Sequence, residues 1–398
     1  MSAFLPIHKC RGLSPTSGDE MDKFIPLSVP NLKGSELEYV ASSIKDEWVS
    51  TGGAYINQFE KNISQYVSSS GAVACQSGTA GLHLSLLAYD IGADDEVIVP
   101  ALTFIAAVNP VKYVGADPVF MDCDDSLCMD IKKLEEFCEK ECVMQNSKLI
   151  DKSSNKHIKA VIIVHVFGNM ADMEHLMNIA EKYNLIIIED ATEALGTYYI
   201  KGQYNGKFAG TIGHIGVYSF NGNKIITTGG GGMVVSDNID ILAHIKYLST
   251  QAKDDEVYFI HNEIGYNYRM TNLQAALGIA QLEQLENFIK IKRDNYHFYK
   301  NNGIKLLPFD ENIRANYWFY SYETDKRDEL IKYLHENKIQ TRPIWNLINN
   351  LPPYKNCQAY KIEKAVDYWN RIVNLPCSTN LTLEDAECVC ANINKFNM

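Results

Sequence analysis

Short apolar runs rich in β-branched residues alternate with segments of helical period over residues 72–240. Such runs, bounded by turn residues, are typical of buried strands. They predict strands at residues 73–75, 96–99, 118–121, 160–165, 185–189, 216–220 and 232–235. The segments between them predict helices at residues 78–89, 104–113, 131–142, 171–183 and 238–249. This alternation is typical of a largely parallel sheet with helices on both faces, so we expect an α/β fold.

Helical spacing also occurs before and after this alternating region. Apolar positions predict one helix over residues 35–47 and another from Phe59 onward. A long amphipathic helix is predicted over residues 270–294. Four leucines recur on it at near-helical spacing, namely Leu273, Leu277, Leu282 and Leu285.

These patterns divide the chain into three parts. Residues 1–23 mix Pro, Ser, Gly and charge without a period and predict a flexible tail, in which Met21 is an alternative start. Residues 24–260 are expected to form a large domain. Residues 261–398, which include the long helix, are expected to form a smaller α/β domain. Strand-like and helical segments at 318–324 and 327–337 alternate within it.

Composition narrows the class of protein. The 398 residues are 46% apolar and contain no run of about 18 apolar residues, which excludes a disordered chain and a membrane-spanning helix. The net charge of −12 argues against a nucleic-acid partner. The N-terminus lacks a signal-peptide pattern, so we expect a cytoplasmic protein. Most of its ten cysteines are then expected to be reduced, buried, small hydrophobes.

The first candidate site is Ser77-Gly78-Thr79-Ala80-Gly81, where a predicted strand runs into a helix through small residues. Free backbone amides at a helix N-terminus, with hydroxyl groups beside them, favour a bound phosphate. The alternative is an ordinary helix capped by Ser77 or Thr79.

The second candidate is the pair Glu189-Asp190 at the end of an apolar strand. Ligands of parallel sheets bind at the carboxyl ends of strands, and a buried acid there needs a cation or a donor. The alternative is that Asp190 only caps a helix.

The third candidate is Lys224, which closely follows a predicted strand and Ser219 and precedes four glycines at 229–232. A partly desolvated lysine amine suits Schiff-base chemistry, and glycines let the backbone approach a ligand closely. The alternative is a glycine-rich hairpin with an exposed lysine.

The fourth candidate is the segment 265–276, in which Asn267 and Arg269 precede the long helix and could reach a phosphate. The alternative is capping of that helix by Thr271 or Asn272, with solvated neighbours. The scattered histidines show no convincing metal-ligand spacing, so no metal is expected.

Together these motifs resemble the pyridoxal-phosphate-dependent nucleotide-sugar aminotransferases of the DegT/DnrJ/EryC1/StrS family, which have the fold-type I architecture. The resemblance extends from about residue 25 to the C-terminus. Four motifs occur in the family's order, namely SGTAGLH at 77–83, EDATEALG at 189–196, YSFNGNKIITTGGGGMV at 218–234 and GYNYRMTNLQAALG at 265–278.

The resemblance implies a role for each matching residue. Lys224 would form the Schiff base with pyridoxal 5′-phosphate and then move the proton, and Asp190 would pair with the pyridinium nitrogen. The cofactor would also meet Gly78, Thr79 and Ser219 at its phosphate, Phe104 at its ring face, Glu193, and Asn267 from the neighbouring subunit. The last contact implies a homodimer with shared sites.

Two positions depart from the family pattern. Many members have His or Gln where Glu193 stands, although Glu is similar to the branch that acts on 4-keto hexoses. Asp is frequent where His214 stands, so no role is carried over to it. Within the family, GNKIITTGGGG and Thr341-Arg342-Pro343-Ile344-Trp345 are most similar to the C4 aminotransferases of the legionaminic-acid and bacillosamine pathways.

The resemblance therefore implies transfer of an amino group from L-glutamate to C4 of a nucleotide-linked 4-keto-6-deoxy sugar, expected to be an N-acetylhexosamine derivative, for surface-glycan or nonulosonic-acid synthesis. Both UDP and GDP sugars are compatible with it. Arg342 is the candidate for the diphosphate and Trp345 for stacking on the sugar or base. The alternatives are a sugar dehydratase, which usually has His in place of Lys224, and a non-catalytic member, which would be expected to lose Lys224 or Asp190.

Overall fold

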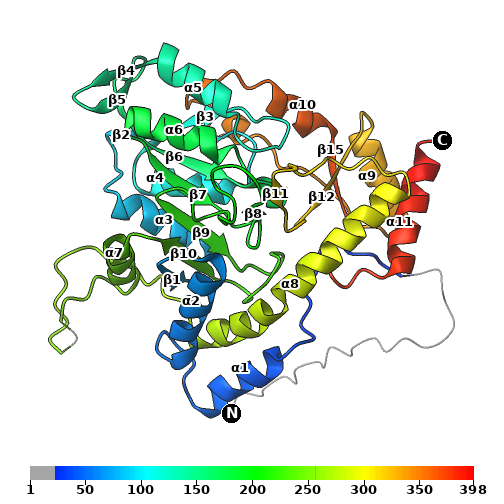
Figure 1. Ribbon diagram of the computed structural model, residues 1–398, viewed down its shortest axis with the longest axis horizontal. Helices are drawn as coiled ribbons and strands as arrows, with labels where there is room; N and C mark the ends of the chain where they lie inside the picture. Colours follow the sequence, from blue (N-terminus) through cyan, green and yellow to red (C-terminus); the bar gives the residue numbers. More distant parts are fainter. Residues whose placement is uncertain (1–22, 256) are drawn as a thin grey trace, which may run out of the picture.

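The computed structural model describes residues 23–398 except residue 256 (Figure 1). The predicted flexible tail and Met21 lie outside the described residues, apart from Lys23. The helices are α1 (Glu36–Lys45), α2 (Ala54–Val67), α3 (Gly78–Ala88), α4 (Asn109–Tyr113), α5 (Ile131–Lys140), α6 (Met173–Tyr183), α7 (Ile239–Ser249), α8 (Asn272–Asn301), α9 (Arg327–Glu336), α10 (Lys364–Arg371) and α11 (Leu383–Phe396).

One large sheet organises the fold, with the strand order β1-β10-β9-β7-β6-β2-β3-β14. Its strands are β1 (Gly71–Cys75), β2 (Asp95–Pro100), β3 (Asp117–Met121), β6 (His157–Val164), β7 (Ile186–Asp190), β9 (Ile215–Ser219), β10 (Gly232–Ser236) and β14 (Ala359–Tyr360), with the hairpin β4 (Cys142–Gln145) and β5 (Lys148–Asp151) attached to β6.

The sheet is mostly parallel, which confirms the expected α/β class. Neighbouring strands from β14 to β9 run parallel. The strand β10 is antiparallel to both β1 and β9, and β5 is antiparallel to β4 and β6. The strand β7 contacts both α3 and α6, and all its residues except Ile186 are buried. Strands covered on both faces become apolar throughout, which explains the run Ile186–Ile188.

Seven predicted strands and most predicted helices are confirmed, but the helix expected over 104–113 is not continuous. It consists of a 3₁₀ turn at Ile105–Ala107 followed by α4. Pro110 lies in the first turn of α4, where its missing N–H is tolerated, and its ring prevents the preceding residues from continuing a helix into it.

The long helix α8 is confirmed and is longer than predicted, but its buried stripe differs from the predicted one. Leu285 is buried, whereas Leu273, Leu277 and Leu282 are half-buried. The helices α1 and α2 pack across α8, and a Cβ atom at Gly278 would lie 2.6 Å from a ring carbon of Phe59. Because this approach is so close, small residues occupy the centre of the contact and the leucines lie beside it.

The C-terminal part forms its own three-stranded sheet in the order β12 (Tyr320–Glu323), β15 (Ile372–Leu375) and β13 (Arg342–Pro343). The chain nevertheless returns to the large sheet, because β14 pairs in parallel with β3. A short two-stranded sheet pairs β8 (Tyr198–Tyr199) with β11 (Ile313–Arg314). The division at residues 260 and 261 stays a prediction. Figure 1 shows α8 running from α1 and α2 to α11, so this helix joins both parts.

Candidate active site

A cavity of about 620 Å³ opens where the carboxyl ends of β6, β7 and β9 meet the C-terminal part. Its lining combines both parts of the chain: Leu27, Ser28, Ser77, Gly78, Thr79, Leu82, Thr103, Phe104, Ala106, Ala107, Val164, Phe167, Asp190, Thr192, Glu193, Ser219, Asn221, Asn223, Lys224, Gly230, Gly231, Trp318, Phe319, Gln340, Arg342, Pro343, Trp345 and Asn374. Three of the four sequence motifs thus contribute to one site.

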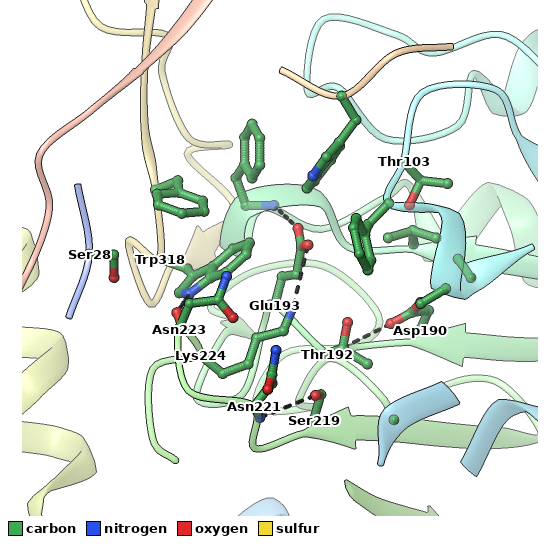
Figure 2. Close-up of a pocket in the computed structure, with 18 of the residues that line it drawn as sticks. Ser28, Thr103, Asp190, Thr192, Glu193, Ser219, Asn221, Asn223, Lys224 and Trp318 are labelled. Atoms are coloured by element: carbon green, nitrogen blue, oxygen red, sulfur yellow. Dashed lines mark hydrogen bonds and ion pairs between the residues drawn. The ribbon is translucent and has the colours of Figure 1, made fainter. Parts of the chain in front are cut away.

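The Lys224 amine lies inside this cavity (Figure 2). Its Nζ is 3.5 Å from Glu193 Oε1 and 4.3 Å from the centre of the Trp318 ring, and its side chain is only 12% exposed. The loop that carries it is held by α8, because Gln274 donates to Gly230 O and Gln281 accepts from Thr227 N–H. Lys224 is therefore a sheltered amine, and the alternative of an exposed lysine on a hairpin is wrong.

Glu193 is the acid that faces this amine. Burial is the main cause that raises its pKa from 4.5 to about 7, while Lys224 opposes the shift. Its Oε2 accepts a hydrogen bond from Phe167 N–H at 2.9 Å. Phe167 adopts a left-handed backbone conformation with φ of 56°, which is strained for a residue with a side chain. The strained backbone thus directs an N–H group at the carboxylate.

The two adjacent acids of the second motif point in opposite directions, as alternation along a strand requires. Glu189 turns away from the cavity and accepts hydrogen bonds from the backbone N–H groups of Gly210, Ile212 and Gly213 and from His165. Asp190 lines the cavity and accepts from Thr192 N–H at 3.1 Å. Burial raises the pKa of Asp190, so this carboxyl group favours a cationic or donating partner.

The N-terminus of α3 forms the floor of the cavity. The Ser77 hydroxyl caps the helix by accepting from Ala80 N–H at 3.0 Å, so the capping alternative holds as well. The amides of Gly78 and Thr79 begin the helix, where backbone N–H groups lack partners within the helix. A Cβ atom at Gly78 would lie 3.0 Å from the side chains of both Ser219 and Thr192, so glycine keeps this floor open.

The glycine-rich loop approaches the same floor. Gly230 and Gly231 line the cavity. The backbone of Gly231 has a φ of 150°, and a Cβ atom at Gly232 would lie 2.6 Å from the Ser77 backbone. These glycines therefore let the loop pack closely against the start of α3, and the expected approach of this backbone to a ligand stays a prediction.

The fourth motif lies outside this cavity. Asn267 is exposed and is not among the cavity residues of its own chain. Arg269 is buried and donates to Glu60 and to Ala74 O, so the expectation that it reaches a phosphate is wrong. It serves instead to hold β1 against α2. Thr271 forms a complete capping box with Gln274 at the start of α8, as the alternative predicted.

His214 is likewise outside the cavity. Its Nδ1 accepts from Ile187 N–H at 2.9 Å, and its carbonyl accepts from the Ser236 hydroxyl at 2.8 Å. These contacts fix the start of β9 at the amino ends of the parallel strands, so His214 has a structural position.

The candidates from the C-terminal part do reach the cavity. Arg342 and Trp345 both line it, and Trp345 packs against Phe104 and Phe167 at ring-centre distances of 6.4 Å and 4.8 Å. Phe104 is 51% exposed, so one of its faces is available to a ligand.

Sequence reasoning missed several polar and aromatic residues of the lining, namely Ser28, Thr192, Asn221, Asn223, Trp318, Gln340 and Asn374. Thr192, Asn221 and Asn223 lie inside or beside quoted motifs, so their proximity to Asp190 and Lys224 was a usable signal. Trp318, Gln340 and Asn374 come from separate C-terminal segments with no shared pattern. Only the fold brings them together.

These groups define the chemistry that the cavity supports. A sheltered amine can attack a carbonyl carbon, a helix N-terminus with hydroxyl groups can hold a phosphate, and a buried acid can pair with a protonated ring nitrogen. Among the described residues, no cluster of three or more His, Cys, Asp or Glu side chains is placed to bind a metal ion. The nine cysteines described by the structure are free, and most are buried.

Known proteins are similar to this sequence over most of its length. Residues 30–394 match the model of the DegT/DnrJ/EryC1/StrS aminotransferase family. The chain is 38% identical to a GDP-perosamine synthase of Escherichia coli O157:H7 over 380 residues, which covers 94% of this chain and 99% of that protein. It is 34% identical to the putative pyridoxal phosphate-dependent aminotransferase EpsN of Bacillus subtilis (strain 168), over 92% of this chain and 94% of that protein.

The fold agrees with a solved member of the same family. The crystal structure of a DegT DnrJ EryC1 StrS aminotransferase from Brucella abortus is similar to this chain with a TM-score of 0.83 at 25% identity. The match covers 91% of this chain and 95% of that one. Within the part of this chain that the structure describes, no helix combines the length and apolar character needed to cross a bilayer.

We predict that Glu193→Gln makes the cofactor-free protein more stable at high pH. The pKa of Glu193 is near 4.5 in the unfolded chain and is raised to about 7 in the folded state. The contribution of this carboxyl group to stability is therefore fully present below pH 4.5 and is lost as the pH rises through 7. Glutamine does not titrate. Its advantage in free energy of unfolding should grow by about 2–3 kcal/mol between pH 5 and pH 8.

Urea unfolding at pH 5, 6.5 and 8 measures this difference. Glu336→Gln, on the exposed surface of α9, is the matched control and should show no such trend. Parallel pH curves for wild type and Glu193→Gln would show that burial does not perturb this carboxyl group.

Proposed function

Because the chain belongs to the DegT/DnrJ/EryC1/StrS aminotransferase family, whose cofactor is pyridoxal 5′-phosphate, we propose that it transfers the amino group of L-glutamate to C4 of a nucleotide-linked 4-keto-6-deoxy sugar. One observation carries the proposal. The amine of Lys224 and the carboxyl group of Asp190 enter one cavity whose floor is the N-terminus of α3.

The cavity fits the cofactor group by group. The α3 amides of Gly78 and Thr79, with the Ser219 hydroxyl, would hold the phosphate, and the open floor at Gly78 leaves room for it. Asp190 would hold the ring nitrogen in its protonated form, since a buried carboxylate is stabilised by a cation. Phe104 would cover one ring face.

When bound, pyridoxal phosphate supplies an electron sink for the electron pair left behind when a proton leaves the substrate carbon. Lys224 would hold the cofactor and, once its amine is free, accept and return that proton at Nζ. Glu193 lies 3.5 Å from Nζ and would keep the amine oriented toward the cavity. The small exposure of Lys224 limits competing exchange with water.

The nucleotide part of the substrate is proposed from the relatives and from the charge of the site. One relative is named for the synthesis of GDP-perosamine, a nucleotide-linked amino sugar, which supports a GDP-linked hexose. The motifs of the Lys224 loop and of 341–345 resemble instead those of the legionaminic-acid and bacillosamine pathways. The N-acetylated hexose expected from that likeness is therefore the alternative acceptor and stays a prediction. Arg342 would meet the diphosphate and Trp345 the sugar or base.

We also propose a cytoplasmic homodimer with shared sites. Asn267 would complete the phosphate site of the neighbouring subunit, since it is exposed and absent from the cavity of its own chain. Large apolar side chains near it on the same segment are exposed, including Tyr258 at 78% and Ile264 at 81%. Large apolar side chains left exposed in this way are consistent with association of two chains.

Two other classes of function find less support. A dehydratase on this scaffold is expected to replace the lysine by His, and a non-catalytic member is expected to lose the lysine or the acid. Lys224 and Asp190 are both present and both line the cavity.

The proposed reaction is tested by its two half-reactions. Incubation with L-glutamate should release one equivalent of 2-oxoglutarate per site. The loaded protein should then aminate a GDP-linked 4-keto-6-deoxyhexose, identified by product mass and by NMR of the C4 proton, more efficiently than a UDP-linked N-acetylated analogue. Release of 2-oxoglutarate without amination of any 4-keto nucleotide sugar would contradict the proposed acceptor.

We predict that Arg342→Ala raises KM for the nucleotide sugar by about tenfold or more, since it removes a charge-assisted hydrogen bond to the diphosphate. The glutamate half-reaction should not change. Arg293→Ala, exposed on α8, is the matched control. Steady-state kinetics of both half-reactions decide the matter: equal damage to both would indicate a structural role for Arg342.

A further inference from the structure

Trp318 lies at the base of the cavity, where no sequence motif marks it. It is 2% exposed and belongs to the segment before β12. Figure 2 shows it beside the Lys224 chain, which ends next to Glu193. Its place among charged groups raises the question of what a buried indole does there.

The face of the indole meets the amine. Lys224 Nζ lies 4.3 Å from the ring centre, which is within the range of a cation–π contact. Such a contact gains strength where water is excluded. The second neighbour of Nζ is Glu193 Oε1 at 3.5 Å. The amine is therefore held between a carboxyl group and a π face.

The edge of the same indole fixes the backbone that carries the lysine. Trp318 Nε1–H donates to Asn223 O at 2.8 Å, and Lys224 N–H donates to Asn221 O at 3.0 Å. The carbonyl next to the lysine is thus tied to the ring that the lysine side chain covers. One residue restrains both ends of the Lys224 side chain.

Trp318 is itself held by two buried polar residues. The backbone N–H of Trp318 donates to Asn316 Oδ1. The side-chain amide of Asn316 in turn donates to Glu193 O and Leu195 O. The backbone carbonyl of Trp318 accepts a hydrogen bond from Lys292 Nζ at 3.0 Å, and the same amine donates to Cys377 O at 2.6 Å. Burial lowers the pKa of Lys292. These hydrogen bonds connect Trp318 to Lys292 on α8 and, through Asn316, to the backbone of Glu193, so they restrain the position of the indole ring.

We propose that Trp318 is a positioning residue for Lys224. Its indole face holds the free amine beside Glu193, and its indole N–H fixes the turn that presents the lysine to the cavity. The inference rests on the proposed function for its consequence, because Lys224 must stay in place while it is detached from the cofactor. The contact itself is a property of the cofactor-free chain and is testable there.

The test is the rate at which Lys224 is acetylated by trace acetic anhydride in the cofactor-free protein at pH 8, measured by mass spectrometry of its peptide. The anhydride must reach Nζ, so a ring that packs against the amine and holds it beside Glu193 slows the reaction. Trp318→Leu removes the π face and Trp318→Phe keeps one, in side chains of similar size. Exposed Lys61 is the internal reference, and Trp369→Phe, which loses an indole bond to Asn346 outside the cavity, is the matched control.

We expect Trp318→Leu to raise the Lys224 acetylation rate about tenfold, equivalent to about 1.4 kcal/mol, and Trp318→Phe to stay within about threefold of wild type. In the loaded enzyme, Trp318→Leu should lower kcat of the glutamate half-reaction about tenfold with little change in KM. Trp369→Phe should match wild type in both. Circular dichroism confirms folding, and Trp318→Met replaces the Leu variant if that variant does not fold.

Equal acetylation of Lys224 in the Leu and Phe variants would overturn the role of the indole face, and wild-type rates in both would overturn the positioning role altogether. Failure of the proposed function is a separate result. In that case wild-type protein would release no 2-oxoglutarate from glutamate, while the acetylation comparison would still decide the role of Trp318.

Discussion

The site depends on holding the Lys224 amine and the Glu193 and Asp190 carboxyl groups close together where little of each is exposed to water. Ions removed from water are costly unless partners replace the solvent. Here Glu193 and the Trp318 ring face the amine, and backbone N–H groups donate hydrogen bonds to Glu193 and Asp190. Burial still raises the pKa of both acids, so their partners in the free chain do not fully replace water. A positively charged, phosphorylated ligand would supply what they lack.

The fold meets this constraint by drawing partners from distant segments onto rigid elements. The carboxyl ends of β7 and β9 carry Asp190 and Ser219. The helix α8 holds the glycine-rich loop through Gln274 and Gln281 and, a few turns later, the Trp318 carbonyl through Lys292. One helix therefore positions both the loop that carries Lys224 and the Trp318 ring that packs against its amine. The strained backbone of Phe167 is stabilised because its N–H group donates a hydrogen bond to Glu193.

Much of this could be predicted from sequence, because Asp190 at the end of β7 and Lys224 in the loop after β9 stand in local patterns whose geometry follows from the parallel sheet. Other features depend on tertiary contacts that no local pattern records. Arg269 sits in a motif yet turns into a buried pair with Glu60. The leucines of α8 keep helical spacing, but close packing at Gly278 selects a different stripe. Trp318 enters the site only because the C-terminal part folds back.

The central claim is that Lys224 is the residue that holds the cofactor, and its most direct test is chemical. Borohydride reduction of the protein loaded with pyridoxal phosphate, followed by proteolysis and mass spectrometry, should find the reduced cofactor on the peptide that contains Lys224. Lys224→Ala should fold, carry no such label and show no transamination. A label on the peptide of the buried Lys292, or undiminished transamination by Lys224→Ala, would contradict the account.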